Sequence, residues 1–93
     1  MGQVWQIHPL AELHWRGWDG EWVAFERVSG HMRTCDALEA ATLACLEGGP
    51  ESLDKIHALL AEDLGIEPCD ELAARLQTII ADFAQCGWLA PAG

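Results

Sequence analysis

Cysteine and serine side chains are the nucleophiles that this sequence offers for catalysis, and its cysteines are also candidate zinc ligands. The closest two cysteines, Cys35 and Cys45, lie ten positions apart, whereas zinc and redox motifs use much shorter spacings. Nucleophilic catalysis also requires a base beside the nucleophile, and no local motif supplies one. We therefore expect no enzyme activity. Although an even number of cysteines allows two disulfides, we expect free thiols that pack as small buried hydrophobic groups. The residues considered are Cys35, Cys45, Cys69, Cys86 and Ser29.

Histidines and carboxylates are the remaining metal ligands of the sequence. One helix usually offers two imidazoles to an ion at positions i and i+4, a spacing that no two of the histidines have. The acidic residues lack the Asp-x-Asp-x-Asp-Gly spacing of a calcium loop and are enriched in first helical turns, where they complement the helix dipole. We expect neither a metal nor a cofactor, and structural or surface roles for His8, His14, His31 and His57.

The tryptophans are the third informative group. Trp15, Trp18 and Trp22 crowd one predicted hairpin, and Trp5 and Trp88 lie near the two ends of the sequence. One interpretation is that they fill a small core. The other is that one or two of them line a contact surface, because aromatic anchors are enriched at protein interfaces. The candidate partner surface is Trp15, Trp18 and Trp22.

The residues around these tryptophans have the pattern of an antiparallel meander. Strands are expected at 13–18, 21–27 and 31–35, where aromatic and β-branched residues are frequent. Tight turns are expected at Asp19-Gly20, the strongest short hairpin signal, and at Ser29-Gly30.

Pairing across these turns determines which strand residues share a face. Two-residue turns place Glu26 opposite Arg33, which predicts a cross-strand ion pair. Both faces carry apolar side chains, so the sequence leaves open which face packs on the helices. Residues 4–7 also alternate, and we expect them to form a short edge strand that His8-Pro9 ends. One face combines Val23 and Phe25 with Met32 and Thr34, and the other combines Leu13, Trp15, Trp22 and Ala24.

Three helices are expected after the meander. A capping box opens the first helix, and glycines end all three, Gly87 being the stop of the third. A three-stranded antiparallel sheet followed by three α-helices is an α+β fold, close to a winged helix. The expected helices run from Asp36 to Gly48-Gly49-Pro50, from Ser52 to Gly65, and from about Cys69 to Cys86, after which Trp88-Leu89 folds back onto the core.

Charge excludes several classes of partner. The sequence has 93 residues, the length of one domain, with 15 acidic and 5 basic side chains and a net charge of −10. The negative electrostatic field of such a chain repels DNA, RNA and anionic lipid, so we expect no nucleic acid and no membrane as partner. No apolar stretch approaches the ~18 residues of a membrane span. The first residues lack a secretory or myristoylation pattern, so we expect a cytoplasmic location.

The order of these features resembles a known family. The tryptophan-rich hairpin LHWRGWDGEWVAF (13–25) is followed by Ser29-Gly30, a short strand, and Asp36 before a helix that contains Ala40-Ala41. A Gly-Pro turn, a leucine-rich helix and a closing Gly87-Trp88-Leu89 come later. This pattern resembles the PqqD-like proteins and, more narrowly, the branch described as peptide chaperones of HPr-related systems. The resemblance covers residues 13–91 and consists of fold patterns.

The resemblance implies a bacterial peptide chaperone, similar to the recognition elements of peptide-modifying enzymes. Residues 1–12 would be an N-terminal arm, and residues 13–93 a winged-helix-like domain that captures the leader of a ribosomally made peptide and presents it to a modifying enzyme. An extended peptide can add to the third strand, because an edge strand has unpaired N–H and C=O groups. From geometry we place the groove between that strand and the third helix. The expected peptide-binding residues are Met32, Arg33, Thr34, Arg75, Thr78, Ile79 and Asp82.

Alternatives remain open at this point. Arg33 and Arg75 beside one groove would suit an acidic peptide, but each can equally sit in a surface salt bridge. The chain can also be a regulatory or structural subunit that docks on a partner protein, such as an HPr-related kinase or carrier, through the tryptophan hairpin. A homodimer that buries the edge strand would favour that alternative. A winged-helix DNA binder fits the fold, but the charge opposes it.

Overall fold

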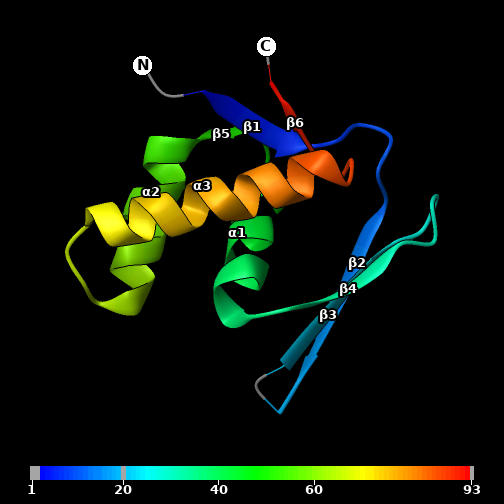
Figure 1. Cartoon of the computed structure of the whole chain (residues 1–93), viewed down its shortest axis with the longest axis horizontal. Coiled ribbons are helices and arrows are strands. Elements are labelled where there is room, and N and C mark those ends of the chain that lie inside the picture. The colour runs from blue at the N-terminus through cyan, green and yellow to red at the C-terminus, as the bar shows by residue number, and fades with distance from the viewer. Residues whose placement is uncertain (1–2, 20, 93) are drawn as a thin grey trace.

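The structure, a computed structural model, describes residues 3–19 and 21–92 and, for Trp18, only the backbone. Figure 1 shows the helices gathered on one side of the molecule and a twisted sheet on the other. A three-stranded antiparallel sheet and three helices confirm the predicted α+β fold. In chain order the elements are β1 (Val4–Ile7), β2 (Leu13–Trp18), β3 (Glu21–Glu26), β4 (Met32–Cys35), α1 (Ala37–Glu47), β5 (Glu51–Ser52), α2 (Leu53–Leu64), α3 (Asp70–Gln85) and β6 (Leu89–Pro91).

The predicted meander is the sheet β2-β3-β4. Its first turn is the expected two-residue loop, because Trp18 pairs with Glu21 and Asp19 has a left-handed φ of 50°; Gly20 lies outside the described residues. The second turn is longer than predicted and spans residues 27–30, so that Arg33 lies opposite Ala24 instead of Glu26. A shift of two positions leaves every side chain on its predicted face.

The carboxylate of Glu26 closes this longer loop. It is buried and accepts hydrogen bonds from the backbone N–H groups of Glu12 (2.9 Å), Val28 (2.8 Å) and Ser29 (2.7 Å). The bonds from Glu12 and Val28 are the main cause that lowers the pKa of Glu26 to about 2; Ser29 adds to them and burial opposes them. The predicted Glu26–Arg33 ion pair is therefore wrong, because the loop uses the carboxylate.

The helix boundaries follow the predicted capping residues. Asp36 and Glu39 make both hydrogen bonds of the capping box at the start of α1. Ser52 accepts a backbone N–H at the start of α2, and Gly65 ends that helix with a left-handed φ of 70°. α3 also occupies the expected segment. Local interactions within a few residues account for the start of α1 and for both ends of α2.

A second three-stranded sheet, β5-β1-β6, joins the two ends of the described chain (Figure 1). β1 is its central strand, since Trp5 pairs with Glu51 on one side and with Pro91 on the other. The prediction of an edge strand at residues 4–7 is therefore wrong in its position. Its partners have only two and three residues, too few for a recognisable alternating pattern. The sheet leads Trp88 and Leu89 onto the core, as expected.

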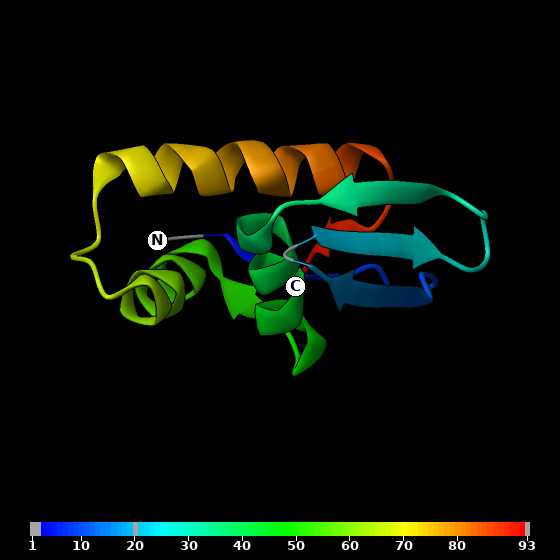
Figure 2. The same cartoon turned by 90° about the horizontal axis from the view of Figure 1, so that it is seen from below.

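The helices pack on one face of the β2-β3-β4 sheet. Ala24 and Cys35 on that face are buried in the same core as Phe83 of α3. On the opposite face Phe25 is 40% exposed and Met32 is 65% exposed. The packed face is thus the one that carries Trp15, Trp22 and Ala24, which answers the question that the sequence left open. Figure 2 shows β4 as the strand of this sheet that lies nearest to α3.

Candidate functional site

β4 is an edge strand whose unpaired side is turned toward α3 (Figure 2). The N–H of Glu26 donates to the carbonyl of His31 at 2.8 Å, so these two residues form a hydrogen-bonded pair of the ladder. Hydrogen-bonded and non-hydrogen-bonded pairs alternate in an antiparallel ladder, and the next bonded pair therefore includes Arg33. The backbone N–H and C=O groups of Met32 and Thr34 consequently point away from β3. An added strand can bond to these groups.

A cleft of about 320 Å³ separates this edge from α3. α3 contributes residues at positions i, i+3, i+4 and i+7, which lie along one face of a helix. One of them, Ile79, is 5% exposed and still lines the cleft, so it adds an apolar patch between polar neighbours. The lining residues are Arg33, Asp36, Glu39, Arg75, Thr78, Ile79 and Asp82.

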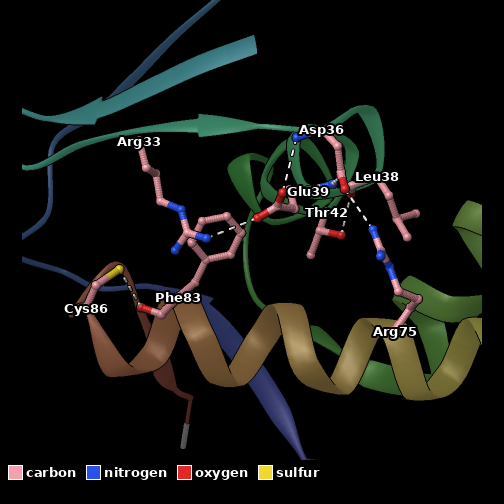
Figure 3. A network of polar contacts seen from close by, with 8 residues as sticks. All are labelled: Arg33, Asp36, Leu38, Glu39, Thr42, Arg75, Phe83 and Cys86. Atoms are coloured by element: carbon pink, nitrogen blue, oxygen red, sulfur yellow. Dashed lines mark hydrogen bonds and ion pairs between the residues drawn. The ribbon is translucent and has the colours of Figure 1, made fainter. Parts of the chain in front are cut away.

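Two ion pairs organise the cleft, and both use a carboxylate of the α1 capping box (Figure 3). Arg33 Nη2 lies 3.2 Å from Glu39 Oε2, and Arg75 Nη2 lies 2.7 Å from Asp36 Oδ2. Each carboxylate uses its other oxygen for the cap: Asp36 Oδ1 accepts the N–H of Glu39, and Glu39 Oε1 accepts the N–H of Asp36. The start of α1 therefore holds both arginines in place, one from β4 and one from α3.

Arg33 also contacts α3 through an aromatic ring. Its Cζ atom lies 4.8 Å from the centroid of the Phe83 ring, a cation–π geometry visible in Figure 3. Next to it along β4, the pKa of the Cys35 thiol is raised to about 11, first by burial and then by the negative charge of Glu39, while Arg33 opposes this rise. A thiol with a raised pKa is a weak nucleophile at neutral pH.

The structure brings together the residues that the sequence assigned to peptide binding. Arg33, Arg75, Thr78, Ile79 and Asp82 line the same cleft. Met32 and Thr34 contribute outward backbone groups, while their side chains lie with Phe25 and Val23 on the other face of the sheet. Binding of a peptide to these seven residues stays a prediction.

Sequence reasoning missed two lining residues, Asp36 and Glu39. It assigned them only to the cap of α1, although Asp36 directly follows the last residue of β4, and this position was a signal that the cap carboxylates lie beside the edge strand. Both Arg33 and Arg75 are in ion pairs, so the salt-bridge alternative holds for each. Because carboxylates of the cleft already neutralise both arginines, their presence beside the groove no longer favours an acidic peptide.

The tryptophan hairpin presents a second surface, away from the cleft. A hollow of about 400 Å³ lies on it, in which the rings of His14 and Phe25 stack with their centroids 5.3 Å apart. Trp15 and Trp22 are half-buried and pack against the core, so core filling explains part of their role; the side chain of Trp18 lies outside the described residues. The hollow is lined by His14, Trp15, Arg16, Val23 and Phe25.

The histidines occupy separate environments. His8 accepts the backbone N–H of Leu10, and His57 accepts that of Cys69. His31 lies edge-on to Trp88, on the face of the sheet opposite to His14. Within residues 3–19 and 21–92, no three His, Cys, Asp or Glu side chains gather as metal ligands.

The four cysteines are free thiols with different exposures. Cys35 is buried, and Cys45 and Cys86 are half-buried. Cys69 is exposed, which contradicts the prediction of buried thiols, because it occupies the N-cap position in front of α3. Among the helices that the structure describes, none combines the length and the apolar character needed to cross a bilayer.

The chain is similar in fold to a solved structure of TbiB1 in complex with the TbiA(beta) leader peptide. The two share 16% sequence identity, and the superposition covers 95% of this chain and 98% of that chain with a TM-score of 0.72. At this identity the likeness establishes the fold. No protein-family model and no curated protein matches the chain.

Proposed function

We propose that this chain is a non-catalytic adaptor that binds the leader segment of a peptide as an added strand on β4, in the cleft against α3. The observation that carries the proposal is the outward N–H and C=O groups of Met32 and Thr34 beside a cleft of about 320 Å³. Strand addition uses such groups for affinity and neighbouring pockets for specificity.

The solved neighbour supports this choice of ligand. TbiB1 has the same fold over nearly its whole length and was solved with a leader peptide. The finer assignment rests on the sequence resemblance: a PqqD-like peptide chaperone of an HPr-related system, which presents a ribosomally made peptide to a modifying enzyme.

A second candidate function is docking on a partner protein without a leader peptide. The observation that favours it is the hollow of about 400 Å³ on the tryptophan hairpin, with Phe25 exposed beside it. Aromatic anchors of this kind are enriched at interfaces.

The experiment that tests the proposal is an NMR titration of isotope-labelled protein with short peptides encoded beside its gene. We expect amide shifts at residues 32–34 and along 75–82, with a scrambled peptide of the same composition as the control. Strand addition also predicts that the amides of Met32 and Thr34 become protected from hydrogen exchange, because their N–H groups gain partners.

Shifts confined to Trp15, Trp18 and Trp22, or no shift with any peptide, would contradict the adaptor proposal. Shifts at the hairpin on addition of a folded partner protein, such as an HPr-related kinase or carrier, would favour the second candidate.

A further inference from the structure

The cleft contains one carboxylate that none of its own cations neutralises. Five charged side chains line it, two basic and three acidic. Glu39 pairs with Arg33 and Asp36 pairs with Arg75. Within the described residues, Asp82 makes neither an ion pair nor a side-chain hydrogen bond, and its side chain is exposed to the cleft.

Helix stability does not account for an aspartate at this position. Asp82 lies in the last turn of α3, which ends at Gln85. The carbonyl end of a helix carries partial negative charge and favours cations, and this turn contains no basic residue. The negative charge of the Asp82 carboxylate and the partial negative charge of the helix end therefore add, and the electrostatic potential in this part of the cleft is negative.

The surroundings reinforce this potential. Three of the five charged side chains that line the cleft are acidic. The whole molecule carries a net charge of −10. A negatively charged peptide side chain would be repelled here, and a positively charged one would be attracted.

The spacing along α3 suits a long basic side chain. Ile79 and Asp82 are i and i+3 on one helix face, so an apolar contact and a carboxylate lie one turn apart in the same cleft. Lysine and arginine bury their aliphatic stems along apolar surface and keep the charged head at a polar site. In an added strand, alternate side chains point to the same side, so one position in every two can reach α3.

We propose that Asp82 is the specificity residue of the cleft and receives a lysine or arginine of the bound peptide, whose stem lies along Ile79. This inference rests on the proposed function. It names the class of ligand: an extended peptide with a basic side chain at one fixed strand position.

The test is a selection from a display library of random linear peptides, about twelve residues long so that they can span the cleft as a strand. Wild-type protein, Asp82→Asn, Asp82→Lys and Asp63→Asn are compared. Asp63 is the matched control, because it is an exposed aspartate in the last turn of α2 and does not line the cleft. The readouts are enrichment at each aligned peptide position and NMR shifts of β4 with the selected peptides.

We expect lysine or arginine to be enriched at one position with wild-type protein and with Asp63→Asn. Asp82→Asn should lose this enrichment and bind the selected peptides about twofold to fivefold more weakly, the range of one exposed charge pair. Asp82→Lys should enrich aspartate or glutamate at the same position. The preference should weaken when salt rises from about 0.05 M to about 0.5 M.

The outcomes separate the two proposals. One outcome is that the selected peptides shift the NMR signals of β4 and yet show no preference for a basic residue at one position. Another is that they show a preference that Asp82→Asn leaves unchanged. Either outcome would overturn the role of Asp82 and leave the adaptor proposal standing. A general excess of basic residues that is spread over all positions would also overturn it, because a protein of this charge attracts basic peptides at any surface. A library that yields no peptide shifting β4 would overturn the adaptor proposal itself.

Discussion

The two sheets that the structure describes have the same number of strands and the same antiparallel pairing, but their edge strands differ. The outer strands of β5-β1-β6 have two and three residues, and β6 ends at Pro91, which has no N–H to donate. Short edges and proline are common protections against unwanted strand pairing. In β2-β3-β4, the edge strand β4 has four residues and turns the backbone groups of Met32 and Thr34 outward.

The two sheets also differ in burial. β6 leads directly from Trp88 and contains Leu89, which are 1% and 2% exposed. The β2-β3-β4 sheet buries one face and leaves Phe25 and Met32 open on the other. The difference suggests separate roles: β5-β1-β6, the closing sheet, stabilises the fold, and β2-β3-β4, the presenting sheet, offers the edge strand β4. Stability and peptide binding should then respond to different substitutions.

The largest expected effect is a loss of folding stability when a buried residue of the closing sheet β5-β1-β6 is truncated. Leu89→Ala should lower the free energy of unfolding by about 2–5 kcal/mol, because it leaves a cavity in the core. The control Met32→Ala, at a residue 65% exposed, should change it by less than about 0.5 kcal/mol. Urea denaturation followed by tryptophan fluorescence measures both. Equal losses for the two variants would mean that the sheets share the stabilising role.

The next largest effect is a loss of peptide affinity when the edge strand β4 is altered. Thr34→Pro removes an outward N–H and adds ring atoms where the peptide strand would lie, while Thr34 makes no ladder bond to β3 by the alternation of the pairs. We expect peptide affinity to fall at least about tenfold, or 1.4 kcal/mol, with the sheet still folded. Thr34→Ala, the matched control, removes only the side chain and should bind within about twofold. Calorimetric titration measures the affinity, and equal binding by both variants would contradict strand addition.

Local sequence patterns predicted most of the elements that build this edge. The capping box of Asp36 and Glu39, the left-handed Gly65 and the hairpin turn at Asp19 each depend on residues a few positions apart. Alternation even predicted the faces of β4 correctly when the register was wrong by two positions, because side-chain direction repeats every two residues.

Contacts between distant residues could not be predicted in this way. Trp5 pairs with Glu51 and Pro91, and no local signal connects positions so far apart. Arg75 meets Asp36 across 39 positions, so this ion pair of the cleft required the tertiary fold.

A smaller effect, a loss of stability in acid, should be specific to the β2-β3-β4 sheet. The pKa of Glu26 is lowered to about 2 by backbone N–H donors, first those of Glu12 and Val28. A group whose pKa is lowered in the folded state stabilises that state fully above its ordinary pKa of about 4.5, and this contribution is lost as pH falls from there through about 2. We expect the melting temperature to fall over this window and the 27–30 loop amides to exchange faster than those of β1.

Glu26→Gln separates this carboxylate from the others that titrate in the same window. The variant should melt lower at neutral pH and show a flatter dependence on pH, because an amide oxygen is a weaker acceptor than a carboxylate. The control is Glu67→Gln, an exposed loop residue that receives none of these hydrogen bonds. Parallel pH profiles for wild type and Glu26→Gln would show that other carboxylates carry the acid response.

The smallest expected effect is at the Arg75–Asp36 ion pair. Its atoms lie 2.7 Å apart, but the two side chains are 54% and 49% exposed, and water and salt screen pairs of this kind. Arg75→Gln should therefore change the free energy of unfolding by about 0–1 kcal/mol, measured by urea denaturation, with Lys55→Gln as the control for loss of one positive charge. A loss well above that range would mean that the pair supports the fold. If the change is this small, the charge of Arg75 can be removed without unfolding the protein. Asp82 lines the same cleft and makes no ion pair within the described residues, so a change in peptide selectivity after its substitution can be attributed to the cleft itself.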